Sequence, residues 1–174
     1  MDATALKAMQ APIKDAYRDD AGKALVTLRA RGSIDDQSIA CKVETGRAMA
    51  IAGLHPATGG SGLELCSGDM LLEALVACAG VTLKAVATAL EFNLRGATVT
   101  AEGDLDFRGT LGVARDAPVG FRTIRLVFDL DTDEPQERVD TFLKLTERYC
   151  VVFQTISVKP ELAVTAVRNG KATD

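Results

Sequence analysis

The chain has few of the residues on which most metal and hydrolytic sites depend. It contains one histidine, His55, among 174 residues, and its four cysteines form no CxxC pair. Zinc sites need cysteine and histidine ligands at recognisable spacings, and no such spacing occurs. The sequence also lacks HExxH, GxSxG and a glycine-rich phosphate loop. We therefore expect no metal site, no cofactor and no histidine-based hydrolytic triad.

Clustered positive charge and uninterrupted apolar runs are also missing. The net charge is -4 and the lysines and arginines are scattered, which argues against nucleic acid as a partner. Glu73 and Lys84 interrupt the longest apolar run, so we expect no membrane span. The N-terminal residues are acidic and mixed, unlike a signal peptide, so we expect a cytoplasmic protein. In that reducing compartment the cysteines should be free or catalytic.

The longest apolar run, Ser67 to Phe92, predicts a central helix. At helical spacing its charged residues fall on one stripe, and Cys78 points away from them. We expect Ser67 to cap this helix and Asp69 to lie in its first turn, where a carboxylate complements the helix dipole. The helix should be mostly buried, with an inward face formed by Leu71, Ala74, Leu75, Cys78, Val81, Thr82, Ala85 and Ala89.

The remaining patterns predict an α+β fold with helices packed on a mainly antiparallel sheet. Residues 2–18 have the spacing of an amphipathic helix that Pro12 should kink or divide. Glu134-Pro135 should open another helix, whose apolar face ends at Cys150. We expect a helical appendage at 1–22 and one domain at 23–174. Strands are predicted at 25–31, 39–43, 47–52, 97–107, 121–131 and 162–167, with a turn at 33–36 and a loop at 55–62.

The cysteines offer the clearest route to chemistry. Cys78 and Cys150 both lie on predicted inward helix faces, where a thiolate can act as nucleophile and a second cysteine can resolve the oxidised sulfur. Both could equally be inert core residues, since free cysteine is among the most buried residue types. Cys41 fits the core face of a strand. Cys66, close to the start of the central helix, is a lesser candidate, and His55 is expected at the surface.

Two segments taken together resemble a known family. The first runs from GGSG through SGDMLLEALVACAGVTLKAVA and contains Ala77-Cys78 and Thr82, and the second is ERYCVVFQTI around Cys150. In this order they resemble the osmotically inducible protein C (OsmC) and organic hydroperoxide resistance proteins, over residues 24–167. The resemblance implies an OsmC-like fold and an intertwined homodimer, with the long helices at its centre and active sites at the interface.

The resemblance also implies a reaction. The residue matching Cys78 attacks a hydroperoxide and becomes a sulfenic acid, and the residue matching Cys150 resolves it as a disulfide, which a dithiol then reduces. In the hydroperoxide branch an arginine and a glutamate support the first cysteine. Arg31 is the best candidate for the arginine and Arg29 a weaker one.

The sequence departs from the family pattern at two places. The hydroperoxide branch has Pro-Glu where this chain has Ser67-Gly68, so Asp69 would have to substitute for the glutamate from one position later. Asp69 could instead serve only the helix dipole. Val151 follows the second cysteine in place of the usual proline. The leading hypothesis is a thiol-dependent peroxidase using Cys78 and Cys150, and the alternative is a non-catalytic dimer that binds a small apolar ligand or has only a structural role.

Overall fold

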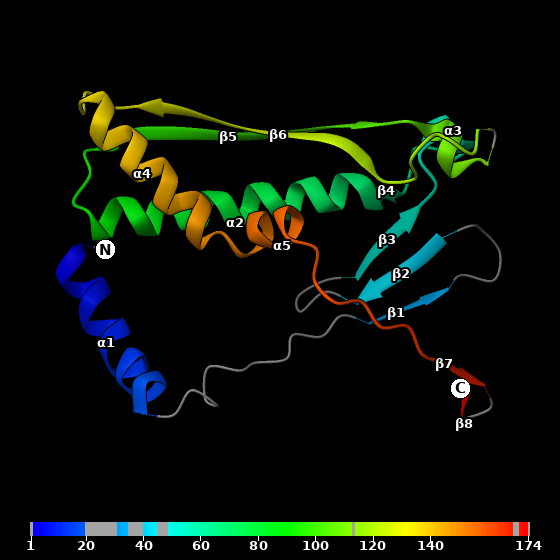
Figure 1. The fold of residues 1–174 in the computed structure, drawn as a ribbon, viewed down its shortest axis with the longest axis horizontal. Helices are drawn as coiled ribbons and strands as arrows, with labels where there is room; N and C mark the ends of the chain where they lie inside the picture. The colour runs from blue at the N-terminus through cyan, green and yellow to red at the C-terminus, as the bar shows by residue number, and fades with distance from the viewer. Residues whose placement is uncertain are drawn as a thin grey trace.

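Helix α2 (Ser67–Ala89) forms the long axis of the fold and lies beneath a hairpin of β5 (Gly96–Leu105) and β6 (Phe121–Asp131) (Figure 1). The computed structural model describes residues 2–19, 31–34, 40–44, 49–112, 114–168 and 171–173. It confirms the predicted α+β class, with a long central helix and mainly antiparallel strands.

The start of α2 differs by one residue from the prediction. Cys66 is the N-cap and makes no side-chain capping bond, so Ser67 is the first helical residue. Asp69 lies in the first turn as expected. The helix ends at Ala89 with Leu90 as its C-cap, and Glu91 has a positive φ of 50°, which turns the chain so that Phe92 packs back into the core.

The buried face of α2 is not the one predicted. Its buried residues are Leu75, Ala79, Leu83, Val86 and Ala87, a stripe rotated by roughly 100° from the expected face. The reason is that α2 packs on β5 along one side and on the C-terminal helices along another. Leu71 and Val81, which were expected inside, are exposed, and Cys78 lies half-buried at the edge of the stripe.

The predicted hairpin is confirmed, and β6 has the predicted bounds. Antiparallel pairing places Val99 opposite Phe128 and Ala101 opposite Leu126. Phe107 was expected in the first strand but begins the short helix α3 (Phe107–Thr110), because the Asp106 carboxylate accepts a hydrogen bond from the Arg108 N–H and caps a helical turn.

Two helices follow the hairpin. The first, α4 (Gln136–Tyr149), has Pro135 as its N-cap rather than as its first helical residue. The second, α5 (Val151–Ser157), was not predicted. Cys150 is the C-cap of α4 and the N-cap of α5, so it lies between two helices rather than on a helix face.

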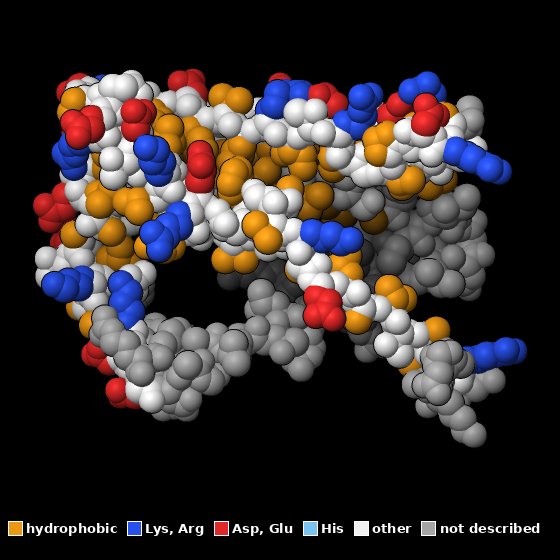
Figure 2. Space-filling view, viewed as in Figure 1, with side chains coloured by type: hydrophobic (Ala, Val, Ile, Leu, Met, Phe, Trp, Pro, Cys, Tyr) orange, Lys and Arg blue, Asp and Glu red, His pale blue; other side chains and the backbone are white. Residues whose placement is uncertain are grey.

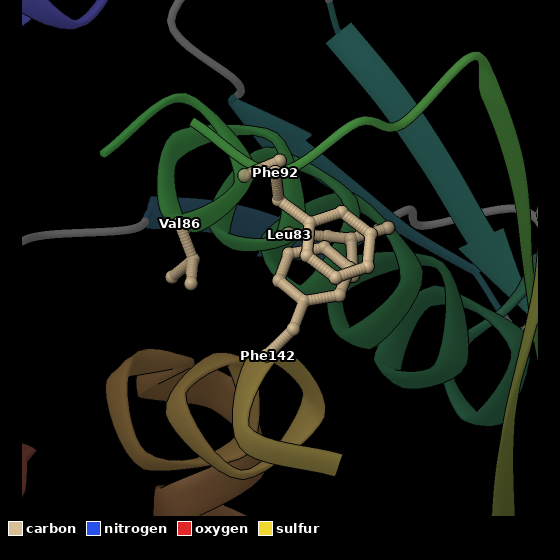
Figure 3. Close-up of a cluster of buried hydrophobic side chains, with 5 residues drawn as sticks. Leu83, Val86, Phe92 and Phe142 are labelled. Carbon is tan, nitrogen blue, oxygen red and sulfur yellow. The ribbon is translucent and has the colours of Figure 1, made fainter. Parts of the chain in front are cut away.

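The main core cluster joins α2 to α4. The rings of Phe92 and Phe142 stack with centroids 4.3 Å apart, beside Leu83 and Val86 (Figure 3). Arg138 lies over the Phe92 ring at 5.7 Å and donates a hydrogen bond to the Leu90 carbonyl, which ties α4 to the end of α2. This cluster fixes the helix that ends at Cys150.

The N-terminal elements are a helix and a four-stranded sheet. Helix α1 (Ala3–Asp19) runs without a break through Pro12, so the predicted division is wrong; an internal proline costs one backbone hydrogen bond, which the helix tolerates here. Within the sheet, β3 and β4 pair in parallel and the other neighbours are antiparallel. Its strands are β1 (Arg31–Ile34), β2 (Ala40–Glu44), β3 (Met49–Gly53) and β4 (Leu65–Cys66).

Other predictions about this half were partly right. The turn expected at 33–36 begins too early, because Ser33 and Ile34 pair with Lys42 and Cys41 inside the sheet. The segment 25–30 and the boundary at 22 and 23 lie outside the described residues. The loop at 55–62 contains a short 3-10 helix, η2 (Pro56–Thr58).

The C-terminal strand is shorter than predicted. It is β7 (Ala166–Arg168), paired with β8 (Lys171–Thr173), while the residues 162–165 are exposed and belong to no strand. The two chain ends lie at opposite sides of the molecule (Figure 1).

By length and composition, α2 is the one helix among the described residues that could cross a membrane. The prediction that this helix is mostly buried is wrong, because five of its 23 residues are buried, where it packs on β5, α4 and α5.

Candidate active site

Cys78 and Cys150 meet where α2 contacts the junction of α4 and α5. Cys150 is 1% exposed and forms a small core cluster with Leu75 and Ala79, against which Cys78 packs. The two thiols share a hydrogen bond. The structure thus brings together the two cysteines that the sequence selected.

Four hydrogen bonds reach the sulfur of Cys78. They come from the Cys150 thiol, the Thr82 hydroxyl and the backbone N–H groups of Val151 and Val152. Burial is the largest single influence and by itself raises the pKa of Cys78, but the four hydrogen bonds outweigh it and lower the pKa below the ordinary value for cysteine. Cys78 is therefore the thiol of the pair that ionises more easily.

Cys150 is shifted in the opposite direction. Burial is the largest influence and raises its pKa; the backbone N–H groups of Phe153 and Val152 lower it, but burial together with the hydrogen bond and charge of Cys78 outweighs them. The Cys150 thiol therefore stays protonated and can donate a hydrogen bond to the Cys78 sulfur. The pair is asymmetric, with one activated sulfur and one protonated neighbour.

The backbone holds Cys150 from both sides. Its N–H donates to the Thr146 carbonyl at 3.0 Å, and its carbonyl accepts from the Gln154 N–H at 2.9 Å. Thr146 is fully buried, and its hydroxyl donates to the Phe142 carbonyl at 2.9 Å. The Gln154 side chain donates to the Glu147 carbonyl at 2.9 Å and so links α5 back to α4. These bonds fix the bend between the helices and the position of the sulfur.

The other predicted site residues are not joined to this pair by the described contacts. Asp69 is exposed and lies nine residues before Cys78, about 14 Å along the axis of α2. Arg31 begins β1, but its side chain, like all of Arg29, lies outside the described residues, so its role stays a prediction. Cys66 is half-buried at the start of α2, away from Cys78.

The sequence placed Thr82 on the same helix face as Cys78 but did not identify the groups that donate hydrogen bonds to the Cys78 sulfur. Thr82 lies four residues after Cys78, so helical spacing alone places its hydroxyl on the same face. The N–H groups of Val151 and Val152 could not be found in this way, because α5 itself was not predicted. Within the described part of the chain, no group of three or more histidine, cysteine or acidic residues is placed to hold a metal ion.

Known structures share this fold. An OsmC-like protein from Mycoplasma pneumoniae is 15% identical with a TM-score of 0.62, over 76% of this chain and 88% of the other. An organic hydroperoxide resistance protein OsmC from Legionella pneumophila is 16% identical with a TM-score of 0.59, over 76% and 90%. One from Elizabethkingia anophelis is 16% identical with a TM-score of 0.58, over 75% and 89%.

The sequence comparison is independent of these structures. No curated protein matches the chain. The family model described as OsmC-like protein matches residues 60–165, which is more than half of the chain and includes both Cys78 and Cys150. This chain therefore belongs to the OsmC-like protein family, whose structural relatives include organic hydroperoxide resistance proteins.

Proposed function

We propose that this protein is a thiol-dependent peroxidase that reduces organic hydroperoxides, with Cys78 as the attacking cysteine and Cys150 as the resolving cysteine. The observation that carries the proposal is the asymmetry of the pair, because the pKa of Cys78 is lowered and that of its neighbour Cys150 is raised. A peroxidase of this kind needs one sulfur that attacks the peroxide as a thiolate and a second that stays protonated until it attacks the sulfenic acid.

In the first step the Cys78 thiolate attacks the outer oxygen of the hydroperoxide. A sulfur–oxygen bond forms as the oxygen–oxygen bond breaks, and the leaving alkoxide takes a proton from solvent to become an alcohol. Cys78 is oxidised to a sulfenic acid. The donors around its sulfur, Thr82 and the backbone of α5, hold the thiolate in place for this attack.

In the second step the sulfur of Cys150 attacks the sulfenic sulfur. The disulfide forms, and the hydroxyl of the sulfenic acid leaves as water with the proton of the Cys150 thiol. A dithiol reductant then returns both cysteines to thiols and becomes a disulfide itself. We place the protein in the cytoplasm, where such reductants keep thiols reduced. Arg31 remains our candidate for a cation that further favours the thiolate.

The working unit that we propose is a homodimer formed around α2. Among the described residues, more large apolar side chains are exposed than are buried. Leu71 and Val81 lie on the uncovered side of α2, and apolar side chains also gather in the open face under the hairpin (Figure 2). Exposed apolar surface on this scale is typical of an interaction site.

The proposal is tested by dithiothreitol-dependent turnover of cumene hydroperoxide. We expect turnover by the wild type, loss of turnover in Cys78→Ser, and strongly reduced turnover in Cys150→Ser. Cys41→Ser, in strand β2, is the matched control and should keep wild-type turnover. Equal rates in all four proteins, or no turnover in the wild type, would refute the proposal.

A second measurement separates catalysis from mere packing of the thiols. After mild treatment with cumene hydroperoxide, mass spectrometry of the wild type should find a Cys78–Cys150 disulfide. Cys150→Ser should instead accumulate a sulfenic acid at Cys78 that dimedone traps. Thiols that stay unreacted would favour the alternative, in which both cysteines only pack the core.

A further inference from the structure

A hollow lies at the start of α2, away from the cysteine pair. Two adjoining cavities of about 310 and 350 Å³ open there, between η2, β5, α3 and the beginning of β6. They share six lining residues: His55, Cys66, Gly68, Leu105, Phe107 and Phe121. Each volume is at the small end of the range of roughly 300–1,000 Å³ that ligand pockets occupy.

The wall shared by the two cavities contains apolar and aromatic side chains. Phe107 and Phe121 come from the two ends of the hairpin loop, and Leu105 lies beside them. Apolar side chains gather at this α3 end of the molecule (Figure 2). The His55 ring stacks on Phe107 with centroids 4.9 Å apart and an angle of 18° between the planes. Aromatic rings in the wall of a pocket can stack against a flat aromatic ligand.

His55 also supplies a hydrogen-bond donor. Its Nδ1 accepts a hydrogen bond from the Ala57 N–H at 3.0 Å, so the proton of the neutral ring is on Nε2. Within the described residues, the structure gives this Nε2–H no acceptor. His55 is half-buried and lines both cavities, so this N–H can serve a ligand that carries an oxygen acceptor.

The charges around the pocket oppose an anionic ligand. Asp69 and Asp104 line its second cavity; Arg125 balances Asp104 in an ion pair, so the opposing charge is that of Asp69. An aromatic carboxylate would therefore meet negative charge at the rim, whereas an uncharged carbonyl compound would not.

We propose that this pocket binds a small, uncharged aromatic carbonyl compound, with its ring against Phe107 and Phe121 and its oxygen accepting from His55 Nε2. This inference is independent of the thiol chemistry proposed for Cys78.

Gly68 keeps the pocket open. A Cβ atom placed there would lie 3.5 Å from the Phe121 ring and 3.6 Å from both Cys66 Sγ and Leu105. A single carbon is accommodated at these distances, but a larger side chain would fill the space between the three residues. Gly68 therefore offers a way to close the pocket without changing His55 or the aromatic side chains of its walls.

The experiment is a fluorine NMR titration of the full-length reduced protein with two probes. The first probe is para-fluoroacetophenone, and the second, para-fluoroethylbenzene, has a similar shape but no oxygen. We expect both to bind and the ketone to bind about fivefold more tightly, since a neutral hydrogen bond contributes about 1 kcal/mol.

Two variants and a control locate the binding. In Gly68→Leu both probes should lose binding. In His55→Phe, which keeps an aromatic ring, the ketone should fall to the affinity of the hydrocarbon. Gly80→Ala, on the same helix but outside the pocket, should bind both probes like the wild type. The proposal is overturned if neither probe binds at millimolar concentration, if the two bind equally well, or if Gly68→Leu binds like the wild type.

Discussion

The thiol of Cys150 donates a hydrogen bond to the sulfur of Cys78, and the pKa values of the two groups are shifted in opposite directions. The direction of this bond follows from the surroundings. Cys150 is buried in the core, while Cys78 has four donors around it, so negative charge is stabilised on Cys78. The predictions below test this asymmetry and the fold that maintains it.

Iodoacetamide labelling should give two different pH profiles for the pair. Alkylation needs the thiolate, so the midpoint for Cys78 should lie below that of the same cysteine in the denatured chain, and the midpoint for Cys150 should lie above it. Mass spectrometry of the labelled peptides against pH measures both. The midpoint, rather than the rate, is the relevant quantity because Cys150 is also poorly accessible. Identical midpoints in the folded chain would contradict the asymmetry.

Val151→Pro should weaken the activation of Cys78. Proline is tolerated at the first position of a helix but has no N–H, so one donor to the Cys78 sulfur is lost and the pKa of Cys78 should rise. For a half-exposed hydrogen bond we expect roughly threefold slower alkylation near neutral pH. Val151→Ala keeps the N–H and removes only an exposed side chain, so its rate should match the wild type. Equal rates for the two variants would show that this donor is unimportant.

Phe142→Ala should destabilise the fold by about 3–5 kcal/mol, because it empties the centre of the larger core cluster. Phe142 is 0% exposed and stacks on Phe92. Phe142→Leu fills more of the space and should cost less. Urea unfolding followed by circular dichroism measures both, and a loss below 1 kcal/mol for the alanine variant would contradict the role of this cluster.

Val81→Glu should prevent self-association. Val81 is 72% exposed on the uncovered side of α2, and in a dimer formed there the new carboxylate would be buried without a partner. Light scattering after gel filtration should find a dimer for the wild type and a monomer for the variant. Lys84→Glu changes the net charge more but lies on the charged stripe, and it should remain dimeric. A dimeric Val81→Glu protein would exclude this face as the interface.

Much of the fold could be predicted because the patterns were local. Alternation gave β6 with its bounds, and helical spacing gave α2 and the face of α4. What failed depended on tertiary contacts. The buried side of α2 was misplaced because its residues are apolar almost all round, so only the positions of β5, α4 and α5 decide which are covered.

The site divides in the same way. Cys78 and Cys150 could be found because cysteine is a rare residue type and each lies on or at the end of a predicted helix. Thr82 could be placed beside Cys78 because it follows at helical spacing. The donors from α5 were not found, because any residue except proline has a backbone N–H and the sequence therefore carries no special mark at Val151 or Val152. The bend at Cys150 that orients these donors depends on two backbone hydrogen bonds: the Cys150 N–H donates to the Thr146 carbonyl, and the Cys150 carbonyl accepts from the Gln154 N–H.

Because the first amides of α5 contact the Cys78 sulfur, their hydrogen bonding should change with the oxidation state of Cys78. In the reduced protein those amides donate to a sulfur whose pKa is lowered, and a disulfide at the same place would be a weaker acceptor. The amide protons of Val151 and Val152 should therefore exchange with deuterated solvent more slowly before oxidation than after it. Hydrogen exchange at these two positions would therefore report the oxidation of Cys78. Tryptophan fluorescence cannot do so, because the protein has no tryptophan.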